Sequence, residues 1–215
     1  MKIYGYFRSS AAFRLRIAMN LKGLSYDHNL INLQAGDHLR DSFRLINPQG
    51  RVPALDIEGD ILTQSLAIIE YLEEVYPAPA LLPQDALEKA KVRGVAGLIA
   101  CDIHPLNNLA VLNYLRDQLE ADEESRIAWY RHWVKEGFDG LEKILSANIE
   151  TGKFCFGDSP TVADICLVPQ VVNAQRFNCD LDCYPTISHI FEECIGLKEF
   201  SDAHPSNQPE AAQLA

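Results

Sequence analysis

Hydrophobic and polar positions follow one pattern in the first third of the chain and another in the rest. In the first third, short alternating runs typical of strands take turns with stretches in which apolar residues recur at helical spacing. Phe13, Ile17 and Leu21 share one face of the first such helix, which Gly23 should end. The pattern predicts strands over residues 2–6, 26–31, 54–57 and 61–62, and helices over residues 10–22, 42–45 and 65–76.

This order, βαβ followed by a ββ hairpin and a helix, is the compact pattern of a thioredoxin-like α/β domain, which we place at residues 1–80. Residues 58–60, Glu-Gly-Asp, are expected to make the tight turn of the hairpin. Prolines at positions 77, 79 and 83 mark a linker after the last helix of this domain. The buried stripe of that helix is expected to contain Leu66, Ile69, Leu72 and Val75.

After the linker, every segment has a helical pattern, so residues 85–215 are expected to form an all-α domain. The first long helical run is interrupted at His104-Pro105, where the proline should kink the helix. The clearest helical runs cover residues 85–119, 122–147 and 186–194.

Two local signals refine this second half. Thr161, with Asp164 three residues further on, forms the pattern of a capping box ahead of an apolar run. The tail after Phe200 is polar and contains proline, so it is expected to be loosely held.

The bulk composition limits the kinds of partner the protein is expected to bind and the cellular compartment in which it is expected to work. The 215 residues include 47% hydrophobic positions, enough for a core, and the net charge of −11 argues against a nucleic-acid partner. No apolar run approaches the roughly 20 residues of a membrane span, and the N-terminus has no signal-peptide pattern. The six cysteines include no CxxC pair, and Cys179 and Cys183 lack further ligands at metal-site spacing. We therefore expect a reduced cytoplasmic protein that binds no nucleic acid, membrane or metal.

The stretch Phe7-Arg8-Ser9-Ser10 has the most distinctive chemistry in the chain. It places two serines where the first strand ends and a helix begins, and the N–H groups and dipole of a helix N-terminus stabilise an anion. A serine hydroxyl there can donate to a negatively charged atom such as a thiolate. Three arginines, at positions 8, 14 and 16, lie close by without an intervening acid, which indicates an anion site. A simpler alternative is that Ser9 or Ser10 only caps the helix.

A thioredoxin-like half followed by an all-helical half resembles the cytosolic glutathione transferases, and this resemblance covers about residues 1–200. Val52-Pro53 resembles the family's cis-proline, where the backbone of the preceding residue pairs with the cysteinyl part of glutathione. Gln64-Ser65, at a helix start, resembles the pair that holds the γ-glutamyl carboxylate. Thr161 and Asp164 match the structural capping box of the family's helical domain.

Within this family, the chain resembles the zeta class, which includes glutathione-dependent isomerases of maleyl acids. Three positions depart from the class pattern: Ala11 replaces a usual cysteine, Phe13 a common tryptophan, and Ala110 an arginine frequent in bacterial relatives. We expect these departures to affect which diacid fits more than they affect family membership. The segments that carry the resemblance to the class are residues 7–18, 102–109 and 174–177.

The resemblance implies a reaction in which the thiolate of glutathione adds to a cis double bond, permits rotation and leaves again. Ser9 would stabilise the thiolate, and Ser10 would assist with the oxyanion. Arg8 and Arg176 would hold the carboxylates of the substrate. As alternatives, either arginine pairs with an acid of the other domain, and His104 caps the kink instead of lining the cofactor site. The cofactor-binding residues implied are His38, Gln49, Val52, Gln64, Ser65, His104 and Asn108.

The implied function is a glutathione-dependent cis–trans isomerase of a maleyl-type dicarboxylic acid in aromatic catabolism, acting as a homodimer. One alternative is a general or haloacid-dehalogenating glutathione transferase, which would use the same Ser9 and cofactor. The other is a non-enzymatic binding module with the glutathione transferase fold. The intact Ser9, Gln64 and Ser65 argue against that module, because a scaffold needs no thiolate site.

Overall fold

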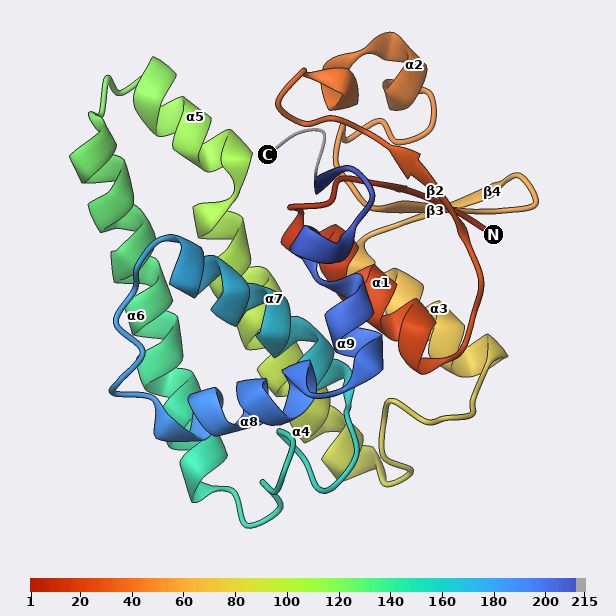
Figure 1. The fold of residues 1–215 in the computed structure, drawn as a ribbon, viewed down its shortest axis with the longest axis vertical. Coiled ribbons are helices and arrows are strands. Elements are labelled where there is room, and N and C mark those ends of the chain that lie inside the picture. Colours follow the sequence, from red (N-terminus) through yellow and green to blue (C-terminus); the bar gives the residue numbers. More distant parts are fainter. Residues whose placement is uncertain (212–215) are drawn as a thin grey trace. The chain divides into compact units, whose positions relative to one another are not determined.

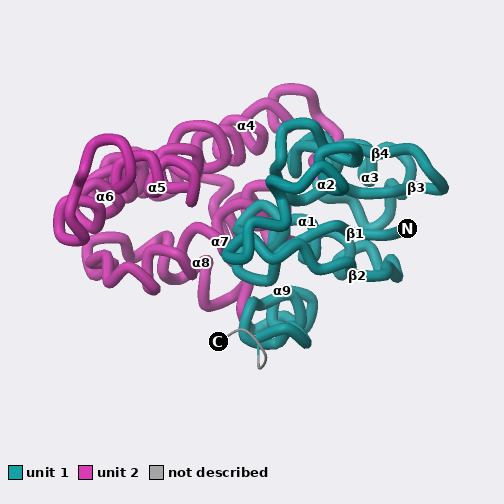
Figure 2. The backbone as a smooth tube through the Cα atoms, turned by 90° about the horizontal axis from the view of Figure 1, so that it is seen from above, with its two compact units in different colours: residues 1–81, 196–215 teal, residues 82–195 magenta. Residues whose placement is uncertain are grey.

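The computed structural model describes residues 1–211, which form two compact units. One unit contains Met1–Leu81 together with the chain from Gly196 onward, and the other contains Leu82–Ile195 (Figure 2). The predicted fold class, a thioredoxin-like α/β domain followed by a helical domain, is confirmed. However, the segment after Gly196, which the sequence assigns to the helical domain, packs with the first unit.

Within the described residues, the first unit is built on a four-stranded mixed sheet. Its strands are β1 (Lys2–Gly5), β2 (Asp27–Leu30), β3 (Ala54–Ile57) and β4 (Asp60–Thr63), as Figure 1 shows. In the order β2-β1-β3-β4, β1 is parallel to β2 and antiparallel to β3, and β3 pairs with β4 as a hairpin. The turn residues Glu58 and Gly59 have φ of 56° and 103°, which suits the primed turns of hairpins.

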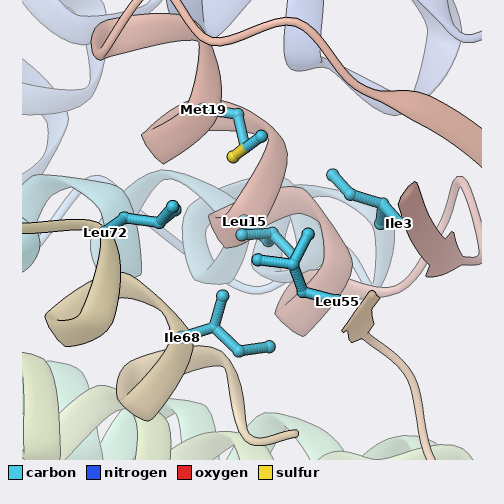
Figure 3. Close-up of a cluster of buried hydrophobic side chains, with 6 residues drawn as sticks. All are labelled: Ile3, Leu15, Met19, Leu55, Ile68 and Leu72. Carbon is cyan, nitrogen blue, oxygen red and sulfur yellow. The ribbon is translucent and has the colours of Figure 1, made fainter. Parts of the chain in front are cut away.

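The core of the first unit lies between the sheet and two helices, α1 (Ser10–Leu21) and α3 (Ser65–Val75). On the other face of the sheet, the Tyr4 ring lies 6.4 Å from that of Phe43 in α2 (Asp41–Arg44). Since neighbouring side chains of a strand point to opposite faces, α1 and α3 cover one face and the α2 segment lies against the other. The core side chains that point toward one another in Figure 3 are Ile3, Leu15, Met19, Leu55, Ile68 and Leu72.

The buried stripe of α3 differs at both ends from the predicted one, and at its start Leu66 is only half-buried. Ile69 and Leu72 are fully buried, as predicted, and they are joined by Ile68. Val75, by contrast, is 48% exposed. It is the last residue of α3, one turn beyond Leu72, where the chain leaves the helix for the proline-rich linker.

The C-terminal segment packs against α1, so the prediction of a loosely held tail is wrong for the residues that the structure describes. Helix α9 (Lys198–Ala203) buries Phe200 completely. The buried Arg16 guanidinium donates to the carbonyls of Ala203 and Phe7, each at 3.0 Å. Hydrogen bonds from a charged group contribute about 1.5–3 kcal/mol each, which explains why this segment belongs to the first unit. The part of the predicted tail after residue 211 lies outside the described residues.

In the second unit, residues 82–195, all the regular elements are helices, joined by loops such as residues 148–161. Helix α7 is its centre: it packs against α4 and α8 and is buried along most of its length. The predicted capping box is confirmed, because the Thr161 N–H donates to Asp164 Oδ2 at 2.7 Å while the Thr161 side chain caps the helix. The helices are α4 (Ala86–Gly97), α5 (Leu109–Asp117), α6 (Glu123–Ala147), α7 (Val162–Arg176) and α8 (Pro185–Ile195).

A π-helical turn and a 3₁₀ turn separate α4 from α5, so the predicted interruption near Pro105 is confirmed. Taken as one helical run, Ala86–Asp117 is long and apolar enough to cross a membrane by length and composition alone. Its most apolar window has a mean hydropathy of 1.4, so the prediction that no apolar run approaches the length of a membrane span is wrong by this measure. A single run of this kind is weak evidence of a span, and Asp102 and His104 would place polar groups in its middle.

Candidate active site

Ser9 is the N-cap of α1 and is only half-buried. Its Oγ accepts a hydrogen bond from the Ala12 N–H at 3.3 Å, and its carbonyl accepts the first bond of the helix, from the Phe13 N–H at 2.8 Å. The capping bond uses a lone pair of the hydroxyl, so the O–H itself can still donate. The capping role and the proposed role toward an anion are therefore compatible in the same side chain.

Ser10 differs from Ser9 in exposure. It is the first residue of α1 and only 5% exposed, whereas Ser9 is half-buried. A ligand outside the helix therefore meets the Ser9 hydroxyl before that of Ser10.

The three nearby arginines do not form one anion site. Arg8 is half-buried, with its guanidinium 5.0 Å from the centre of the Phe7 ring. Arg16 is fully buried and bonded to backbone carbonyls, so its assignment to an anion site is wrong. Burial lowers the pKa of Arg16 to about 10, which leaves it protonated at neutral pH. Arg14 is also buried, 2% exposed, and approaches the start of α3 instead.

The N-terminus of α3, in the same unit, lies beside a buried arginine. Arg14 Nη1 lies 3.5 Å from Ser65 Oγ, which places a buried positive charge beside the first turn of α3. Gln64 Nε2 donates to Gln49 Oε1 at 2.9 Å, so two residues distant in sequence are brought together. Gln64 has a φ of 69°, a conformation that costs a residue with a side chain about 1–3 kcal/mol and is common at functional sites.

Two loop residues of the first unit have polar groups without a hydrogen-bond partner in residues 1–211. The Val52-Pro53 bond is cis, and Val52 lies outside the sheet, which begins at Ala54. Among the described residues, no backbone hydrogen bond engages Val52. His38 has a buried Nδ1 without a partner in residues 1–211. Burial, followed by the charge of Arg51, lowers the pKa of His38, so its ring is neutral at neutral pH.

The residues predicted from the second half have different surroundings. Asn108 is the N-cap of α5: its Oδ1 accepts from the N–H groups of Ala110 and Val111, and its Nδ2 donates to the Pro105 carbonyl at 2.7 Å. A structural role thus accounts for this side chain, and its contact with glutathione stays a prediction. His104 begins the 3₁₀ turn before α5 and is half-buried, and its cofactor contact likewise stays a prediction.

Arg176 lines a cavity of about 260 Å³ within the second unit, to which α6 contributes Arg126 and Arg131. These two arginines were not predicted from the sequence. They are ordinary polar positions of a long amphipathic helix, and only the fold places them near the end of α7. No group of three or more His, Cys, Asp or Glu side chains in residues 1–211 is arranged to hold a metal ion.

Comparison with known proteins gives a consistent result at the level of sequence. The family described as "Glutathione S-transferase, N-terminal domain" matches residues 3–80. The maleylpyruvate isomerase of Ralstonia sp is 48% identical over 212 residues, covering 99% of this chain and 100% of that protein. A full-length match at this identity extends the relationship beyond the N-terminal domain.

Two solved structures agree with the fold along the whole chain. One is the holo structure of a maleylpyruvate isomerase described as a bacterial glutathione transferase of the zeta class. It is 47% identical with a TM-score of 0.97, covering 98% of this chain and 100% of that one. The other is a maleylacetoacetate isomerase from Methylobacterium extorquens AM1 with bound malonate and glutathione. It is 43% identical with a TM-score of 0.95, covering 98% of this chain and 99% of that one.

Proposed function

Because this chain belongs to the zeta class of the glutathione transferase family, we propose that Ser9 stabilises the thiolate of glutathione during isomerisation. The chain is a glutathione-dependent cis–trans isomerase that converts a maleyl-type diacid, maleylpyruvate or maleylacetoacetate, to the fumaryl product in aromatic catabolism. The observation that carries the assignment of the site is the half-buried Ser9 hydroxyl at the N-cap of α1. Its donor capacity and the helix dipole act together on an anion.

In the proposed reaction, glutathione supplies the nucleophile and the protein stabilises the charges that form. When bound, glutathione supplies a thiolate nucleophile whose reversible addition to the conjugated alkene allows rotation about that bond. An ordinary thiol has a pKa near ~8.5, so the site must lower this value to keep the thiolate at neutral pH. Ser9 does so by donating a hydrogen bond to the sulfur. Ser10, beside it at the start of α1, is proposed to assist with negative charge on the substrate oxygen.

The first unit offers groups that suit the rest of glutathione. The N–H groups at the start of α3 and the buried Arg14 charge favour a carboxylate, and Ser65 lies at that position. The exposed pair Gln64–Gln49 can exchange amide hydrogen bonds with the ligand. The backbone of Val52 provides a further polar group, and His38, whose Nδ1 is buried in this structure, is proposed to border the cofactor site.

Arg8 and Arg176 are proposed to hold the carboxylates of the substrate, since a guanidinium binds carboxylate through two parallel hydrogen bonds. Both side chains are at least partly exposed, and neither makes an ion pair with an acid of the described residues. The related Methylobacterium enzyme binds malonate, a short dicarboxylate, together with glutathione. Two cationic residues would favour a diacid over a monoacid.

The test of this function follows the absorbance of the conjugated maleyl group in maleylpyruvate and maleylacetoacetate, with glutathione present. We expect loss of the maleyl chromophore and recovery of glutathione unchanged, because an isomerase consumes no thiol. Consumption of glutathione with release of halide from a haloacid would instead support the dehalogenating transferase. Retention on glutathione resin without turnover of either substrate would support a binding module.

Substituting Arg176 should affect the diacid and not the cofactor. Loss of a hydrogen bond to a charged partner weakens binding by about ten- to a hundredfold, so Arg176→Ala should raise the KM for the diacid by that factor. The measurement is a pair of titrations, diacid at saturating glutathione and glutathione at saturating diacid. Arg116→Ala, which removes an exposed arginine bonded to the adjacent Asp117, is the control. An unchanged KM for the diacid, or a collapse of glutathione affinity, would assign Arg176 a structural role.

A cytoplasmic homodimer that does not span a membrane is proposed in addition. The acidic chain with its free cysteines suits a reducing compartment. Large apolar side chains are exposed along the α4–α5 run, including Leu87, Leu109 and Tyr114, and a second copy could cover them. Light scattering of the purified protein should give twice the mass of 24.1 kDa. A monomer mass at micromolar concentration would reject the dimer.

A further inference from the structure

Three arginines line the cavity of about 260 Å³ in the second unit. Arg126 and Arg131 come from α6, and Arg176 is the last residue of α7. Among the described residues that line the cavity, Glu123 supplies the one carboxylate. Only Arg176 has a part in the function proposed above, so the other two arginines need an explanation of their own.

Backbone carbonyls hold two of these arginines in place. Nε of Arg131 donates to the Phe177 carbonyl at 2.9 Å, and Nε of Arg126 donates to the Asp122 carbonyl at 3.3 Å. A guanidinium carries its donors in a rigid fork, so each arginine keeps its terminal N–H groups for another acceptor. Side chains that are already oriented lose less conformational entropy when a ligand binds.

The balance of charge in the cavity favours an anion. Among the lining residues, three arginines against Glu123 leave an excess of positive charge in a chain whose net charge is −11. The carboxylates of Asp117 and Asp122 interact electrostatically with Arg126, so the excess lies mainly on Arg131 and Arg176. Within residues 1–211, none of the three arginines forms an ion pair with an aspartate or glutamate. Neighbouring like charges raise the free energy of the empty cavity, and a bound anion would relieve that repulsion.

We propose that this cavity is a carboxylate subsite, in which Arg126 and Arg131 act with Arg176 to select a dicarboxylate substrate. The guanidinium fork matches the two oxygens of a carboxylate. Ile127 and Phe177 line the same cavity and give apolar surface to the carbon chain next to the carboxylate. The inference deepens the proposed function and rests on it, because Arg176 is the substrate residue that lines the cavity.

The test measures binding and does not depend on turnover. Malonate is titrated into the protein saturated with glutathione, and its Kd is measured by calorimetry for the wild type, Arg126→Gln and Arg131→Gln. We expect each variant to bind malonate about tenfold more weakly, the lower range for losing a charged hydrogen bond, with unchanged affinity for glutathione. Arg116→Gln, an exposed arginine of the same unit, is the matched control and should bind malonate like the wild type.

Further probes separate the charge of the subsite from its shape. The preference for malonate over acetate, a monoanion, should be smaller in Arg126→Gln and Arg131→Gln than in the wild type. The reason is that the subsite would bind the second carboxylate, which acetate lacks. Arg131→Lys keeps the charge but not the fork, so it should retain more malonate affinity than Arg131→Gln. Inorganic phosphate that competes with malonate at equal concentration would overturn the carboxylate assignment, since it would show a general anion site.

The outcomes distinguish this inference from the proposed function. If neither glutamine variant changes the Kd for malonate while the wild type isomerises a maleyl diacid, the subsite is wrong and the proposed function stands. If the wild type binds malonate through these arginines but isomerises no maleyl diacid, the subsite stands and the proposed function is wrong. In a third outcome, Arg131→Gln and Arg131→Lys both lose malonate binding while Arg126→Gln binds malonate like the wild type. That result would mean that Arg131 only holds Phe177 in place, and it would overturn the inference.

Discussion

Turnover of the maleyl diacid should fall to the uncatalysed rate when glutathione is left out, because the nucleophile belongs to the cofactor. All six cysteines of the chain lie between positions 101 and 194, in the second unit, whereas Ser9 lies in the first. Cys155 is fully buried, and burial raises the pKa of its thiol, which leaves it protonated and a poor nucleophile. The measurement is the initial rate of chromophore loss with and without added glutathione, after dialysis of the purified protein.

Removal of the protein's own thiols is the matched control for that experiment. Cys101, Cys179 and Cys183 are at least partly exposed, so their combined replacement by serine should leave both the fold and kcat unchanged. The buried Cys166 and Cys194 are replaced by alanine one at a time, with the unfolding temperature measured beside the rate. Activity that persists without glutathione and disappears in the triple serine variant would show that a protein thiol is the nucleophile.

The secondary structure was predictable because its signals are local. The strand Ala54–Ile57 was predicted at its observed bounds, since a turn before it and a Gly turn after it limit the run. The capping box at Thr161 was equally visible, because its two residues are three positions apart. The C-terminal segment was not predicted, because Arg16 and the carbonyl of Ala203 that it binds are 187 positions apart. A polar sequence gives no sign of such a partner.

The same difference between local and long-range signals applies to the residues of the candidate site. Ser9 could be predicted because a strand end and a helix start adjoin it in sequence. Gln49 and Gln64 were both predicted, but their mutual hydrogen bond depends on how the loop before β3 folds back on α3. The role of Arg126 beside Arg176 depends entirely on how α6 and α7 pack. Local patterns identify helix termini, and only tertiary structure identifies which side chains share a cavity.

One departure from the zeta-class pattern has a structural explanation. Phe13, where a tryptophan is common, is 1% exposed, and its ring lies edge-to-face with that of His204 at 5.8 Å. This position therefore contributes to packing between α1 and the segment after α9. Ala11 follows Ser10 in the first turn of α1 and is half-buried. Neither position brings a nucleophile to the site, which agrees with a thiolate supplied by glutathione.

Replacing Ser9 by alanine should lower kcat by about 100- to 1,000-fold, the range measured for losing one preorganised hydrogen-bond donor. The Ser9 hydroxyl is half-buried at the N-terminus of α1, where a donated hydrogen bond to sulfur adds to the field of the helix. Without the hydroxyl, the pKa of the bound thiol should rise toward its ordinary value, so less thiolate is present at neutral pH. The measurements are kcat and the pH dependence of thiolate absorbance in the complex with glutathione.

The difficulty in this experiment is that Ser9 also caps α1, and losing an N-cap costs about 0.5–2 kcal/mol of stability. Ser9→Asp separates the two roles, because aspartate caps a helix as well as serine does but places a negative charge beside the thiolate. It should be as stable as the wild type and at least as inactive as Ser9→Ala. Ser9→Thr keeps the hydroxyl and should keep most of the activity, while Ser10→Ala should cost less than Ser9→Ala because Ser10 is buried. Normal turnover in Ser9→Asp would mean that helix capping alone sustains the reaction.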